Sequence, residues 1–157
     1  MKTLTITAGA SRHKQIQARD DEMVKLYNET LLLMVRHGVD APRSEAVKFV
    51  VANGSPRYHV SYKCAYENVR KRLSKGKMPI AFSPQECMWN EMALRVKQLT
   101  ACGISIAAAV DFVLRHCRAT RYFIDPVSLN ARIGPARRRR ALALMQPYQK
   151  STNNTNH

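Results

Sequence analysis

Apolar residues recur at intervals of three, four and seven along most of this chain, and that spacing is typical of amphipathic helices. The clearest helix start is Ser83-Pro84-Gln85-Glu86, which combines a serine cap, a proline at the first helical position and a glutamate at the third. Glycine is scarce, whereas alanine, leucine, lysine, arginine, glutamate and methionine favour helix over sheet. We therefore predict an all-α fold, a compact bundle of five or six helices.

The expected helix boundaries follow from serine or aspartate caps and from glycine stops. Asp40 and Asp125 are expected to cap two of the helices, and Gly134 to end a short final one. For Pro135 to Met145, a weak helix within the C-terminal arm is an alternative to an irregular segment. The predicted helices span residues 14–37, 40–53, 61–74, 83–102, 105–117 and 125–133. The predicted organisation is a flexible N-terminal arm over 1–12, a helical domain over 13–134, and a flexible basic, partly disordered C-terminal arm over 135–157.

Positive charge is concentrated in two blocks of the 157-residue chain, whose formal net charge is +15. Residues 57–77 hold seven Lys or Arg and one acidic residue, and residues 115–157 hold nine and one. The stretch between them is nearly neutral and apolar. Self-repulsion makes such blocks costly unless a polyanion is the usual partner, and nucleic acid is the commonest polyanion. The charge pattern therefore predicts a nucleic-acid partner.

The first candidate binding element is a helix-turn-helix-like unit made of helices 43–53 and 61–74. The second helix would enter the major groove of duplex DNA, where its early side chains would meet base edges. The connection over 54–60 is longer than usual for this motif, and a solvated basic helix face is the alternative. The candidate reading face consists of Lys63, Glu67, Arg70 and Lys71, and the candidate phosphate contacts are Arg57, Arg72, Lys75 and Lys77.

The second candidate is a tight helix-turn-helix over residues 95–117. Its second helix carries alanine, valine and Asp111 where a DNA reader needs polar side chains. We therefore favour an αα-hairpin packed in the core or at a dimer interface.

The third candidate is a run of four arginines near the C-terminus, where paired guanidinium groups can bind phosphates or enter a narrow minor groove. A solvated tail and a nuclear import signal are alternatives with the same composition. A membrane-surface contact needs a larger amphipathic helix than this segment offers. The four residues are Arg137, Arg138, Arg139 and Arg140.

No catalytic signature, cofactor motif or metal-binding spacing was found, so we expect neither an enzyme nor a bound cofactor or metal. The four cysteines fall on or beside apolar helix positions, which predicts reduced, core-filling thiols. A zinc site from His59, Cys64, His116 and Cys117 is conceivable, but the spacing does not require it. The remaining cysteines are Cys87 and Cys102.

Together these features predict a DNA-binding protein with a regulatory or accessory role. An RNA-binding, ribosome-associated protein and a helical protein–protein interaction module are the alternatives, and a homodimer is compatible with each. The N-terminus has no signal-peptide core, and no apolar run is long enough for a membrane span. We expect a soluble protein without membrane contact, in the bacterial cytoplasm and nucleoid or, in a eukaryote, in the nucleus.

Overall fold

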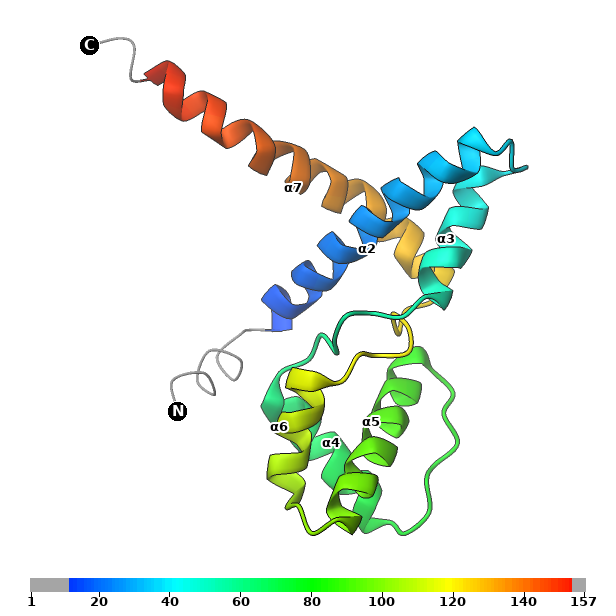
Figure 1. Ribbon diagram of the computed structural model, residues 1–157, viewed down its shortest axis with the longest axis vertical. Helices are drawn as coiled ribbons and strands as arrows, with labels where there is room; N and C mark the ends of the chain where they lie inside the picture. Colours follow the sequence, from blue (N-terminus) through cyan, green and yellow to red (C-terminus); the bar gives the residue numbers. More distant parts are fainter. Residues whose placement is uncertain (1–11, 154–157) are drawn as a thin grey trace.

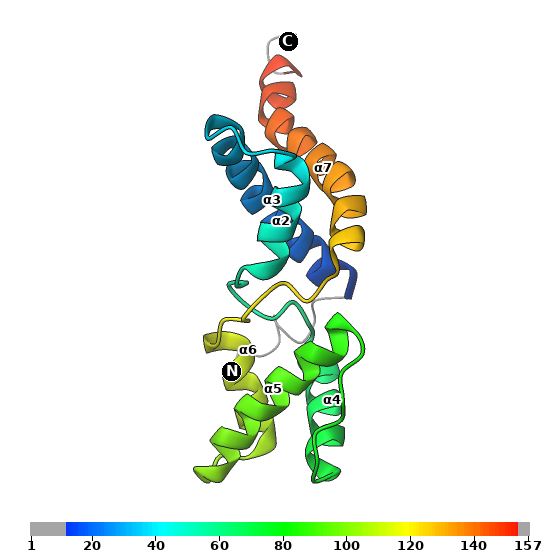
Figure 2. The same cartoon turned by 90° about the vertical axis from the view of Figure 1, so that its right-hand side faces the viewer.

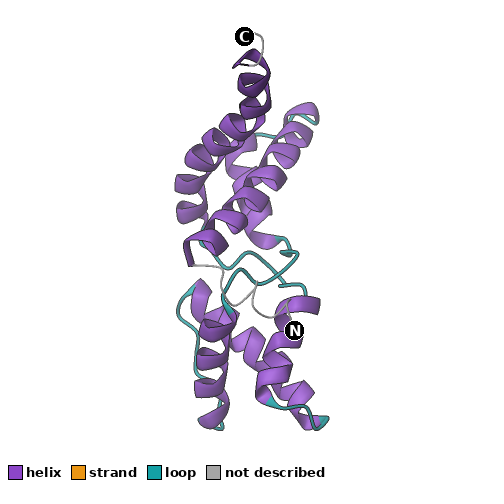
Figure 3. Ribbon diagram, turned by 90° about the vertical axis from the view of Figure 1, so that its left-hand side faces the viewer, coloured by secondary structure: helices purple, strands orange, loops and turns teal. Residues whose placement is uncertain are grey.

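The computed structural model describes residues 12–153, which form six helices and no strand (Figures 1 and 3). The predicted all-α fold is confirmed. The N-terminal arm predicted over 1–12 lies outside the described residues except for Arg12, which begins the first described helix. The helices are α2 (Arg12–Arg36), α3 (Pro42–Ala52), α4 (Tyr62–Ser74), α5 (Pro84–Ala101), α6 (Ile106–His116) and α7 (Pro126–Asn153).

Four of the predicted helix starts are made by the expected side chains. Ser61, Ser83 and Ser105 each accept a hydrogen bond from the backbone N–H three residues further on, at 3.2–3.3 Å. The Asp125 carboxylate accepts one from the backbone N–H of Ser128 at 2.9 Å, and this bond lowers the pKa of Asp125. These contacts satisfy N–H groups that have no partner within the helix. Helices α4 to α7 therefore begin where the local sequence predicts their starts.

The expected cap of α3 by Asp40 is wrong. The N-cap residue is Ala41, in the left-handed region with φ of 49°, and it makes no side-chain cap bond. Pro42 occupies the first helical position as predicted. A Cβ atom in this conformation crowds the following carbonyl oxygen, so the turn before α3 is strained.

Replacing Ala41 with glycine is therefore expected to raise the free energy of unfolding by about 0.5–1 kcal/mol, because removing the Cβ relieves strain that exceeds the added unfolded-state entropy. Urea titration followed by circular dichroism measures the change. Ala131→Gly is the matched control: Ala131 is exposed within α7, and this change should lower stability by roughly 1 kcal/mol. A loss of stability in the Ala41→Gly variant would contradict the strain argument.

The six helices form two groups, each with its own hydrophobic core (Figures 1 and 2). Helices α2, α3 and α7 pack together, as do α4, α5 and α6, and within residues 12–153 no helix of one group packs on a helix of the other. The first core includes Met23, Val24, Tyr27, Val50, Leu129 and Ile133. The second includes Val69, Trp89, Met92, Val96, Val110 and Val113.

Two connections, residues 53–61 and 117–125, carry the chain from one group to the other and back. They meet in a single antiparallel bridge between Ser55 and Ala119, with an N–O distance of 3.2 Å. A Cβ at Gly54 would lie 3.3 Å from the Ala119 carbonyl oxygen, which leaves little room for a side chain. The close approach of these segments fixes where the two groups join.

This arrangement decides between the two helix-turn-helix candidates. The predicted pairing of helices 43–53 and 61–74 is wrong, because α3 belongs to the first group and α4 to the second. The extended connection between them leads each helix to a different core. The αα-hairpin predicted over 95–117 is confirmed. Helices α5 and α6 pack against each other, and Val110 and Val113 of α6 are buried in the core.

The predicted end of the last helix at Gly134 is wrong. Helix α7 continues through Gly134 and Pro135 to Asn153, so it crosses the predicted boundary between helical domain and arm. Ile133 and Ala136 are both buried against the first core, which holds the helix on either side of the two unfavourable residues. Packing therefore outweighs the intrinsic penalty of glycine and proline in a helix.

Candidate nucleic-acid interface

Helix α4 buries one side and exposes cations on the other, as predicted. Ala65 and Val69 are fully buried in the core shared with α5 and α6. Lys63, Arg70 and Lys71 are exposed. Lys75 and Lys77 are exposed just beyond the end of the helix.

The arginine run is part of α7, on a stretch of helix that leads away from the rest of the molecule (Figure 1). Arg137, Arg138 and Arg140 are exposed. Arg139 differs from its neighbours, since one of its terminal nitrogens lies 3.1 Å from Asp21 Oδ1 of α2. Three of the four arginines therefore remain available for an external anion.

Eight of the eleven predicted site residues share two properties: they are exposed, and they have no carboxylate partner within 4.0 Å among residues 12–153. We call them the free cation set. Charges of this kind lose little hydration in the free protein and can pair with a polyanion without first breaking an internal ion pair. The set consists of Lys63, Arg70, Lys71, Lys75, Lys77, Arg137, Arg138 and Arg140.

The two helices that carry most of the free cation set lie toward the same side of the molecule. Figure 2 shows α4 and the first half of α7 on that side, with the beginnings of α2 and α5 between them, and Figure 3 views α4 and α7 from the opposite direction. Because α4 packs its buried side against α5 and α6, its cations face away from them. Helices α4 and α7 are separated by more than fifty residues in sequence and belong to different helix groups.

Three predicted phosphate contacts instead have internal partners. Arg72 donates from Nε to Asn90 Oδ1 at 3.0 Å and joins α4 to α5. Arg57 Nε lies 3.9 Å from Glu22 Oε1, and Arg139 pairs with Asp21 as described above. The sequence could not separate these three from the rest, because their partners come from distant segments.

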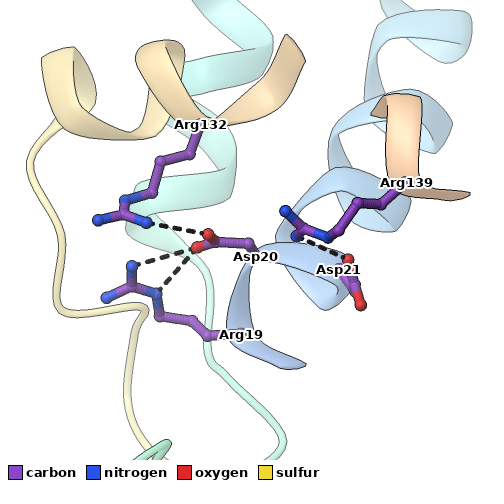
Figure 4. Close-up of polar contacts among 5 residues, drawn as sticks. All are labelled: Arg19, Asp20, Asp21, Arg132 and Arg139. Atoms are coloured by element: carbon purple, nitrogen blue, oxygen red, sulfur yellow. Dashed lines mark hydrogen bonds and ion pairs between the residues drawn. The ribbon is translucent and has the colours of Figure 1, made fainter. Parts of the chain in front are cut away.

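A buried aspartate fixes the crossing of α2 and α7 (Figure 4). Asp20 is 4% exposed, and its two carboxylate oxygens contact Arg19 and Arg132, each at 3.1 Å. The ion pair between Arg139 and Asp21 adds a second contact between the same helices. These contacts hold the basic part of α7 at a defined angle to the body of the molecule.

Sequence reasoning missed a second concentration of arginines, where the two connections meet. Arg12 and Arg19 come from α2, Arg121 from the second connection and Arg132 from α7; with Arg57 they line one cavity. No local pattern could reveal this cluster, since its members are spread over about 120 positions of the chain.

The prediction of buried thiols is wrong for two of the four cysteines. Cys64 is exposed on α4 and Cys102 is exposed in the turn after α5, while Cys87 and Cys117 are partly buried. Within the described part of the chain, no group of three or more His, Cys, Asp or Glu side chains is placed to hold a metal ion, so the four residues of the zinc alternative do not come together.

None of the helices in residues 12–153 has the length and apolar character needed to cross a membrane. Compared with known proteins, the chain matches no family model, no curated protein and no solved structure.

Proposed function

We propose that this protein binds nucleic acid, with duplex DNA as the preferred target, and that it acts as a regulatory or accessory protein without catalysis of its own. The observation that carries the proposal is the free cation set: eight exposed Lys and Arg side chains on α4, on the segment just after it and on α7, none with a carboxylate partner within 4.0 Å among residues 12–153. Positive charge exposed in this way matches the negative charge of a phosphate backbone.

Helix α4 would supply the contacts closest to the bases. Lys63, Glu67, Arg70 and Lys71 are all exposed on its outer face, and side chains of this length can reach base edges from a helix in the major groove. Glu67 is the exception in charge: it repels phosphate but can accept a hydrogen bond from a cytosine amino group. In this proposal α4 belongs to a three-helix group rather than to the helix-turn-helix first expected.

Salt dependence is the direct test of this proposal. If about six phosphates are neutralised, the logarithm of the association constant for duplex DNA should fall with the logarithm of salt concentration with a slope near −5. Fluorescence anisotropy with a labelled duplex between about 50 and 300 mM NaCl measures the slope. A flat response would contradict the proposal.

Competition between duplex DNA and duplex RNA of equal length separates DNA binding from RNA binding. We expect DNA to displace RNA at moderate salt, because the major groove of A-form RNA is too narrow for a helix such as α4. Preferential retention of RNA would favour the ribosome-associated alternative instead.

Assembly through α7 is a second candidate function, supported by a separate observation. The helix exposes three large apolar side chains just beyond the arginine run: Leu142 at 64%, Leu144 at 66% and Met145 at 56%. Apolar contacts survive high salt, whereas phosphate contacts do not. Sedimentation at about 1 M NaCl therefore tests this candidate, since a dimer formed through these residues would persist there.

A further inference from the structure

A cavity of ≈ 270 Å³ lies at the junction of the two helix groups. Its walls come from α2, both connections, α4, α5 and α7. Five arginines and one histidine line it, and no Asp or Glu among residues 12–153 does: the arginines are Arg12, Arg19, Arg57, Arg121 and Arg132, and the histidine is His59.

The arginines are only partly neutralised by nearby acids. Arg19 and Arg132 share the single carboxylate of Asp20. Arg57 lies 3.9 Å from Glu22, whose other oxygen faces His59. These two carboxylates pair with three of the five guanidinium groups, so five positive charges at the cavity face two negative ones. A recess that concentrates one sign of charge attracts anions strongly.

Two of the five arginines have no acidic partner. Among the described residues, Arg12 and Arg121 form no ion pair, and the guanidinium of Arg121 is placed 5.3 Å from the centre of the Phe123 ring. Both are exposed at the cavity. Guanidinium groups in this state are suited to bind a phosphate through paired hydrogen bonds.

His59 provides a buried polar group in the same wall. Its side chain is 5% exposed, and its Nε2 atom lies 2.8 Å from Glu22 Oε2, but the alignment of the two atoms does not form a hydrogen bond. Its ring stacks on Tyr122, with 6.2 Å between centroids. The contacts with Glu22 and Tyr122 hold the His59 ring in place within the cavity wall.

Three aromatic side chains form part of the wall. Tyr58, Tyr122 and Phe123 line the cavity, and the rings of Tyr58 and Phe123 stack at 6.4 Å. Burial, followed by the nearby Glu22 carboxylate, raises the pKa of Tyr122 to about 12. Burial and the hydrogen bond to Glu91 raise the pKa of Tyr58 as well. Both phenols therefore stay neutral at physiological pH and add no negative charge.

We propose that this cavity binds a phosphate monoester, with the phosphate contacted by Arg12 and Arg121 and the organic part against the aromatic wall. The volume exceeds that of a phosphate group alone and suits a small phosphorylated molecule such as a nucleoside monophosphate. The same group also occurs at the 5′ end of a nucleic-acid strand. The site does not depend on the free cation set, since none of those eight residues lines it.

Calorimetric titration of the full chain tests the proposal and separates the two sources. Adenosine monophosphate should bind once per chain at about 0.1 M NaCl, with adenosine at least about tenfold weaker. A 5′-phosphorylated hexanucleotide is compared with its unphosphorylated form, and the tighter of the two phosphorylated ligands identifies the source. The proposal is overturned if neither phosphorylated ligand binds better than its unphosphorylated counterpart.

Two matched variants place the binding at this cavity. Arg121→Gln removes an exposed arginine from the wall and should weaken binding of the phosphorylated ligand about tenfold or more. Arg118→Gln removes the same charge from an exposed residue of the same connection that does not line the cavity, and should change binding less than about twofold. Equal losses in both variants would show that net charge alone attracts the ligand and would overturn the assignment, whereas duplex binding through α4 and α7 should persist in both.

Discussion

The Leu129→Ala variant is expected to lose about 2–5 kcal/mol of stability in the group formed by α2, α3 and α7, and to leave the other group nearly unchanged. Leu129 is 1% exposed within the first core. Removing its side chain deletes apolar contacts and leaves a cavity that the surrounding helices fill only in part. Because no helix of one group packs on a helix of the other, the damage should remain local.

The single tryptophan of the chain makes this test possible. Trp89 lies in the core of α4, α5 and α6, so its fluorescence reports that group alone. Far-ultraviolet circular dichroism reports all helices. In Leu129→Ala we expect part of the dichroism signal to be lost at lower urea concentration, while the midpoint of the Trp89 transition stays where it is in the unmodified protein.

Met92→Ala is the matched control, since Met92 is fully buried beside Trp89. It should move the Trp89 transition by an amount equivalent to about 2–5 kcal/mol. If Leu129→Ala moved the Trp89 transition by the same amount as the dichroism transition, the two groups would unfold as one unit and the argument for separate cores would fail.

The helices could be predicted from sequence because most of their boundaries depend on neighbouring residues. Ser61, Ser83 and Ser105 cap helices through bonds that span three positions. The partners of those helices could not be predicted in the same way. Helix α3 packs on α7, some eighty residues further on, rather than on α4, and the amphipathic pattern does not specify which apolar face meets which.

The end of α7 was predicted wrongly because tertiary packing overrides a local sequence signal. Gly134 and Pro135 are strong local signals for a helix end, but buried contacts of Ile133 and Ala136 with α2 and α3 override them. Local propensity loses when long-range packing stabilises the alternative.

For the candidate interface, the sequence located the charge but not its partners. Local composition was enough to identify all eight residues of the free cation set. It could not show that Arg72 bonds Asn90 or that Arg139 pairs with Asp21, since those contacts depend on the tertiary fold. The cavity lined by arginines could not be predicted from the sequence for the same reason.

Neutralising the exposed cations of α4 and α7 is expected to weaken duplex DNA binding more than any other surface change. One triple variant replaces Lys63, Arg70 and Lys71 with glutamine, and a second replaces Arg137, Arg138 and Arg140. Each lost phosphate contact is expected to weaken binding roughly tenfold near 0.1 M salt, so each triple variant should bind about 100- to 1,000-fold more weakly. All six side chains are exposed, and none forms an ion pair within the described residues. Their replacement should therefore leave the helical content unchanged.

A third triple variant controls for net charge. Replacing Lys48, Lys97 and Arg115 with glutamine removes an equal number of positive charges, three, from exposed positions on α3, α5 and α6. Lys48 and Arg115 are already paired with Glu45 and Asp111. This variant should bind duplex DNA within roughly tenfold of the unmodified protein. A loss as large as that of the α4 or α7 variant would indicate unspecific attraction.

The salt slope of these variants on one short duplex is the most direct measurement of whether α4 and α7 bind the same polyphosphate. Each of the α4 and α7 variants should reduce the steepness of the slope by about 2–3, and the variant that combines them should approach a slope of zero. The control variant should keep a slope near −5. If only one of the two segments changed the slope, or if the unmodified protein gave no slope at low salt, the two basic helices would not form a common binding surface.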